Sequence, residues 1–135
     1  MSPERDRDRL GRPLPPDADP DLVVPGVPQR EAITDEEAWT EGMAYLANGL
    51  PFHAHEVFEL RWRQAPDEYR DAWRALAQWG AALTHAARGN AAGARAVAAR
   101  AHLLLETVDA PACVDRVRVR ASLAELEGSD EPESG

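Results

Sequence analysis

Apolar residues recur at helical spacing through the middle of this 135-residue chain. Intervals of three and four residues place side chains on one face of an α-helix, whereas strict alternation would indicate a strand. One such stripe comprises Trp39, Met43, Leu46 and Leu50. A longer one comprises Tyr69, Trp73, Leu76, Gly80, Leu83 and Ala87, and a third comprises Ala94, Val97, Ala101, Leu104 and Val108. The pattern therefore predicts amphipathic helices.

Local signals mark where these helices begin and end. Thr34 followed by Glu37 forms a capping box, in which the two side chains satisfy free N–H groups of the first turn. Pro51 suits the first turn of a second helix, because that position needs no backbone donor. We expect helices near residues 35–48, 51–64, 67–88, 90–108 and 112–127. They predict an all-α fold, a compact bundle of about five helices with the third helix at its centre.

One segment fits two interpretations. Residues 116–121, RVRVRA, alternate as a strand does. However, Val114, Val117, Ala121 and Ala124 fit helical spacing, and the chain offers no second strand to pair with this one. We therefore predict a helix here.

The two ends of the chain differ in composition from the middle. Residues 1–30 hold seven of the 11 prolines and few large apolar side chains, which is typical of a mostly disordered arm. Within it, residues 22–24 can still lie against the core. Residues 128–135 are polar and acidic, and we expect a short disordered tail. The predicted organisation is an arm over 1–30, one helical domain over 31–127 and a tail over 128–135.

Charge and cysteine content narrow the classes of partner. The net charge of −9 argues against binding to nucleic acid or to an anionic membrane. Residues 31–59 carry acids and no base, whereas residues 60–108 carry an excess of Arg, so ion pairs within the fold or with a second copy or another protein are expected. Cys113 alone excludes a thiolate zinc cluster. With no apolar signal segment or spanning run, we expect a cytoplasmic protein.

Ionisable residues on apolar helical faces are the candidate site. His55 and Glu59 lie four residues apart on one helical face, and His85 lies on the apolar third helix. If the second and third helices are antiparallel, these three side chains can meet, and two imidazoles with one carboxylate suit a divalent metal ion of unspecified identity. The same polar site on these two helices is also compatible with a small ligand. Glu59 stands where a zinc peptidase would have its second His, so we do not predict a peptidase.

The same residues fit other interpretations. His, Glu and Gln side chains can satisfy one another as a structural network, and the protein would then be a non-catalytic interaction or scaffold module. A metal-dependent hydrolase with Glu56 or Glu59 as general base is a third interpretation, so the residues leave open whether the protein is an enzyme. We expect His53, two residues from His55, to be exposed and His102 to be partly buried.

Two blocks of residues resemble one known family. His55, Glu59 and Trp62 match an H-x-x-x-E-x-x-W pattern, and a second block contains Gln78, His85 and Arg88-Gly89-Asn90. Over about residues 36–108 the chain resembles domain-of-unknown-function family 309, an all-helical bacterial and archaeal family with no established reaction. The resemblance implies that His55 and Glu59 are metal ligands. We expect the supporting polar or pocket residues to be Glu56, Trp62, Gln78 and Arg88.

Overall fold

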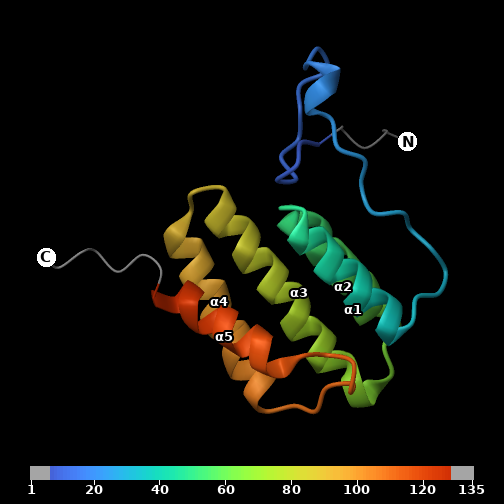
Figure 1. The fold of residues 1–135 in the computed structure, drawn as a ribbon, viewed down its shortest axis with the longest axis vertical. Helices are drawn as coiled ribbons and strands as arrows, with labels where there is room; N and C mark the ends of the chain where they lie inside the picture. The colour runs from blue at the N-terminus through green and yellow to red at the C-terminus, as the bar shows by residue number, and fades with distance from the viewer. Residues whose placement is uncertain (1–6, 129–135) are drawn as a thin grey trace, which may run out of the picture.

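The computed structural model describes residues 7–128, which form five α-helices (Figure 1). They are α1 (Asp35–Ala47), α2 (Pro51–Gln64), α3 (Asp67–Ala87), α4 (Ala91–Glu106) and α5 (Arg116–Gly128), and a short 3-10 turn, η1 (Pro20–Leu22), precedes them. Each helix packs against the next, and α3 also contacts α5. The predicted all-α bundle with α3 at its centre is confirmed. None of these described helices combines the length and the apolar character needed to cross a bilayer.

The helix ends follow the local signals in the sequence. The Thr34 hydroxyl accepts a hydrogen bond from the Glu37 N–H, and the Glu37 carboxylate accepts one from the Thr34 N–H, so the capping box is complete. The segment RVRVRA is helical, as predicted. However, α5 begins at Arg116 and not near residue 112, because the Asp115 carboxylate accepts a hydrogen bond from the Arg118 N–H at 3.0 Å and caps the helix there.

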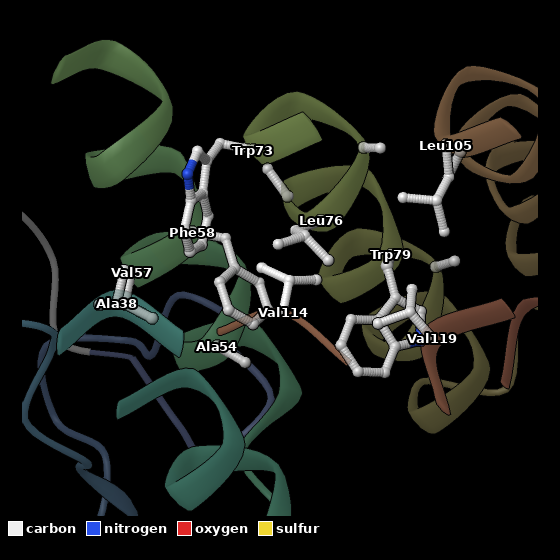
Figure 2. Packing of buried hydrophobic residues seen from close by; sticks show 14 of the residues in the cluster. Ala38, Ala54, Val57, Phe58, Trp73, Leu76, Trp79, Leu105, Val114 and Val119 are labelled. Atoms are coloured by element: carbon white, nitrogen blue, oxygen red, sulfur yellow. The ribbon is translucent and has the colours of Figure 1, made fainter. Parts of the chain in front are cut away.

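The core is organised around one aromatic ring. Phe58 of α2 is fully buried, and its ring lies 6.1 Å from that of Trp73 and 6.0 Å from that of Trp79, both on α3. The Trp39 ring of α1 also stacks on Phe58, with its centroid 6.5 Å away. Figure 2 shows Phe58 among side chains from several helices. Aromatic pairs at these separations stabilise the core beyond the burial of apolar area.

The two buried indoles of α3 also have hydrogen-bond partners. Trp73 Nε1 donates to the Asp35 carboxylate and Trp79 Nε1 donates to the Ser122 hydroxyl, each at 2.8 Å. Asp35 accepts a second bond from Arg61 Nε of α2. A buried N–H without a partner is costly, so these bonds fix α1 and α5 in position relative to α3.

Glycines on α1 and α3 let both helices approach α2 closely. A Cβ added at Gly42 of α1 would lie 2.2 Å from the Phe58 ring, so the ring occupies the space that a side chain would fill. A Cβ added at Gly80 of α3 would lie 2.7 Å from His55 Cα and 2.8 Å from His55 N. At Gly80 the obstacle is backbone, which has no other rotamer to adopt. The separation of α2 and α3 therefore depends on this residue.

Residues 7–25 follow a defined path at the end of the bundle where α2 begins, and the chain then runs along the side of the bundle to the start of α1, drawn from blue to cyan in Figure 1. Arg9 Nη2 donates to the Gly49 carbonyl at 3.1 Å, and Gly11 packs against the Phe52 ring. The sequence predicts a mostly disordered arm over 1–30, whereas Arg9, Gly11 and Pro25 contact the loop before α2 and the first turn of that helix. Arg30 pairs with Glu41 of α1. The expected disorder of residues 1–6 and 129–135 lies outside the described residues, and the division into arm, domain and tail stays a prediction.

Substituting Gly80→Ala tests the close packing of α2 and α3. Alanine favours a helix over glycine by about 1 kcal/mol, so propensity alone would stabilise the variant. We expect instead a free energy of unfolding lower by about 1–3 kcal/mol, because the methyl group forces the helices apart. Urea denaturation followed by circular dichroism measures this. Gly26→Ala, where nothing lies within 4 Å of the new methyl, is the control. A Gly80→Ala protein as stable as the wild type would contradict the packing described.

Candidate functional site

His55 lies on the face of α2 that meets α3. Its Nδ1 atom is 2.8 Å from the backbone carbonyl oxygen of Ala77 on α3. A carbonyl oxygen can only accept a hydrogen bond, so Nδ1 carries the proton and donates. Nε2 of the neutral ring then holds a free lone pair. The side chain is 24% exposed, which leaves part of the ring in contact with solvent.

Glu59 stands one helical turn after His55. One of its carboxylate oxygens, Oε2, is 3.9 Å from His55 Nε2, and the other, Oε1, accepts a hydrogen bond from Arg63 Nη2 at 2.8 Å. The Glu59 side chain is 27% exposed, similar to that of His55. The Nε2 lone pair and a carboxylate oxygen therefore face each other at a distance too long for a hydrogen bond.

His85, the second predicted imidazole ligand, lies at the same end of α2 and α3 as His55. His85 and His55 both line a small cavity of about 110 Å³, together with Phe52, Ala81, Thr84 and Arg88. His85 Nδ1 accepts a hydrogen bond from the Asn90 side-chain amide at 3.1 Å. Because the start of α2 faces the end of α3, the two helices are antiparallel, as the metal hypothesis required. Glu59 is one turn further along α2 and does not line this cavity.

The three predicted ligands therefore do not form one cluster. Within residues 7–128, no group of three or more His, Cys, Asp or Glu side chains is placed so that it could hold a metal ion. The pair that faces one another is His55 and Glu59. The metal site stays a prediction, and the geometry that supports it is that of these two residues.

The predicted supporting residues are spread over several surfaces. Arg88 lines the His55 cavity, whereas Glu56 lines a separate cavity beneath residues 23–29. Gln78 lines a groove between α3 and α4. Trp62 is half-buried against the hydrophobic core. Helical spacing alone could not show which cavity each residue lines, because residues on one wide helical face can point into different cavities.

His53 is buried, which contradicts the expectation of an exposed residue. It is only 3% exposed, and its Nε2 donates to the carbonyl oxygen of Pro25 at 2.8 Å, while Nδ1 has no hydrogen-bond partner in the structure. The prediction was wrong because residues 23–29 cover this side of α2. The spacing of apolar residues in α2 gives no sign that residues 23–29 lie over His53.

Arg88 connects the end of α3 to the N-terminal segment. It is the C-cap residue of α3, followed by Gly89 with a positive φ of 82°, as the predicted helix end required. Its Nε and Nη2 atoms both donate to the backbone carbonyl of Leu10, at 3.0 and 2.6 Å. The guanidinium carbon is 5.9 Å from the Phe52 ring centroid. Arg88 therefore positions residues 7–13 beside the candidate site.

A second His–Glu pair offers an internal comparison. His102, half-buried as expected, has Nε2 3.7 Å from Glu106 Oε1, also with a spacing of four residues. Here, however, Nδ1 contacts the Glu127 carboxylate and not a backbone carbonyl, and Glu106 pairs with Arg120. Both ring nitrogens face carboxylates, which suits a structural link between α4 and α5.

The single thiol is a poor alternative ligand. Burial raises the pKa of Cys113, and the negative charges of Glu36 and Asp35 raise it further. A raised pKa keeps the thiol protonated at neutral pH, whereas metal coordination needs the thiolate. Imidazole and carboxylate groups therefore remain the candidate ligands.

Comparison with known proteins gives one match. A family model described as Domain of unknown function (DUF309) matches residues 39–97. The matched segment contains His55, Glu59 and His85. No curated protein and no solved structure matches the chain.

Substituting Arg88→Ala tests how residues 7–13 are held. We expect faster amide hydrogen exchange at residues 7–13, because the Leu10 carbonyl loses both of its Arg88 donors. Hydrogen exchange with mass spectrometry measures this, and far-ultraviolet circular dichroism should show unchanged helicity. Arg100→Ala, which removes an exposed guanidinium from α4, is the control. Equal exchange in the two variants would show that Arg88 does not hold the segment.

Proposed function

Through residues 39–97 the chain belongs to the family described as Domain of unknown function (DUF309), and we propose that it binds a divalent metal ion through His55 and Glu59. The observation that carries this proposal is the hydrogen bond from His55 Nδ1 to the Ala77 carbonyl. Histidines that bind metals commonly donate their other ring N–H to a carbonyl or a carboxylate, which sets the tautomer and the orientation of the ring. His55 meets this requirement before any ligand arrives.

The donor set fits a transition metal better than magnesium or calcium. Imidazole nitrogen suits Zn, Cu, Fe and Ni, and a carboxylate oxygen completes a common ligand pair. The 3.9 Å between Nε2 and Oε2 leaves room for an ion between them after small side-chain movements. Arg63 pairs with Glu59 and therefore already compensates part of the negative charge of this carboxylate.

Two protein ligands would leave several coordination positions to water or to a bound molecule. Both side chains are partly exposed, so such molecules have access to the ion. A metal ion bound in this way supplies Lewis acidity to its other ligands. A cytoplasmic location and binding to a second copy or another protein remain predictions from the sequence.

A second candidate function is that of a non-catalytic interaction module. It is favoured by the internal partners of the polar groups, since Ala77 bonds His55, Arg63 bonds Glu59 and Asn90 bonds His85. In such a protein the cluster would contribute stability alone. Removing His55 would then lower the free energy of unfolding by about 1–3 kcal/mol, because a partner is left without its hydrogen bond.

Metal titration of the full chain separates the two candidates. We expect the metal-free protein to bind one equivalent of Zn²⁺ or Ni²⁺ saturably in isothermal titration calorimetry, with Mn²⁺ and Fe²⁺ as further probes. The His55→Ala, Glu59→Gln double variant should bind at least about tenfold more weakly, because both ligands are lost. The matched control is the His102→Ala, Glu106→Gln double variant, which removes the same residue types at the same spacing and should bind as the wild type does.

Equal affinities of the wild type and the His55, Glu59 double variant would contradict the metal proposal. A metal-independent loss of stability in that variant, with no binding in either protein, is the result that the interaction module predicts. Circular dichroism of each variant shows whether the helices remain formed.

A further inference from the structure

A second cavity, of about 260 Å³, lies between the N-terminal segment and the first turns of α2. One wall is made by Arg7 and by residues from Val23 to Gln29, and the other by Phe52, His53 and Glu56. This cavity is more than twice as large as the one beside His55. It is separate from the proposed metal pair, because neither His55 nor Glu59 lines it.

The wall formed by the N-terminal segment is held in place by hydrogen bonds. The Val24 N–H donates to the Arg7 carbonyl at 2.9 Å, which sets the two parts of the segment side by side. His53 Nε2 donates to the Pro25 carbonyl at 2.8 Å and thereby attaches the segment to α2. The His53 ring is almost fully buried under this cover. The cavity is therefore bounded by defined contacts on both sides.

The two walls carry opposite charges. Glu56 is half-buried and has no hydrogen bond or ion pair within the described part of the chain. Arg7 uses Nη1 to donate to the Gly11 carbonyl, and its guanidinium carbon lies 5.4 Å from the Phe52 ring centroid. Among residues 7–128, Arg7 and Glu56 form no ion pair with each other. A half-buried charge without a partner is unfavourable unless something else compensates for it.

We propose that this cavity binds a small zwitterion, a free α-amino acid with a short apolar side chain. The ligand's ammonium group would donate to the Glu56 carboxylate, and its carboxylate would accept from the free N–H groups of Arg7. Its side chain would pack among Val23, Val24 and Val27, which line the same cavity. One ligand would thus compensate for both charges.

The size and the lining disfavour other ligand classes. At about 260 Å³ the cavity lies just below the range of about 300–1,000 Å³ that is usual for pockets of drug-sized ligands, which suits a small molecule such as valine or leucine. Glu56 would repel a phosphate or a simple carboxylate. A purely apolar molecule would leave the Glu56 carboxylate with no compensating partner.

Valine and its two truncated analogues test the proposal on the full, metal-free chain. Isobutylamine lacks the carboxylate of valine, and isovalerate lacks its ammonium group. By isothermal titration calorimetry or nuclear magnetic resonance titration, we expect saturable binding of L-valine or L-leucine. Each analogue should bind at least about tenfold more weakly, because one charge-assisted contact is lost.

Two single substitutions locate the site. Glu56→Gln and Arg7→Gln should each weaken binding of L-valine by about tenfold or more. The controls are Glu125→Gln and Arg100→Gln, which make the same changes at exposed positions outside the cavity. Unchanged circular dichroism and an unchanged thermal midpoint in all four variants would show that a loss of affinity reflects contacts with the ligand.

Three outcomes would overturn the proposal. They are no saturable binding of either amino acid at millimolar concentration, binding of an analogue as tight as that of valine, and binding unaffected by Glu56→Gln and Arg7→Gln. Because the chain is metal-free in these titrations, none of these results depends on a metal at His55 and Glu59. The metal titration can therefore fail while this proposal stands, and the reverse also holds.

Discussion

The close approach of α2 to both of its neighbours is the constraint on which the rest of the structure depends. Gly42 on one side and Gly80 on the other remove the side chains that would hold the helices apart. The Phe58 ring can then lie among three indoles from α1 and α3. A tightly packed core stabilises a small domain through many weak contacts, each of which weakens when the helices separate. Two positions without side chains thus control the packing of three helices.

The same constraint shapes the chemistry of the candidate site. Because Gly80 brings the α3 backbone against His55, the carbonyl of Ala77 lies within hydrogen-bonding distance of the imidazole. That bond selects the tautomer and turns the free lone pair towards Glu59. The orientation of the ring is therefore a property of helix packing, and a slightly wider separation would free the ring to rotate. Core packing and the polar site cannot be treated as separate parts of this protein.

The fold could be predicted from the sequence because its signals are local. The capping box at Thr34 and the proline at position 51 both act on the backbone within a few residues, so they marked helix starts correctly. The candidate site was predictable only in part, since helical spacing places His55 and Glu59 on one face but cannot set the angle between two packed helices. His53 shows the limit most clearly. Its burial depends on Pro25, which is distant in sequence and has no periodic relation to α2.

The contacts between the N-terminal segment and the bundle mostly use backbone carbonyls as acceptors. Arg88 binds the carbonyl of Leu10, His53 binds that of Pro25, and Arg9 of the segment binds that of Gly49. A carbonyl is the same whichever residue bears it, so several positions of the segment could change identity without losing these bonds. Substitutions at these positions would therefore lose little stability, and the path of the chain would be preserved. The match to the family begins at residue 39, so relatives with dissimilar leading segments could still cover the same end of their bundles in the same way.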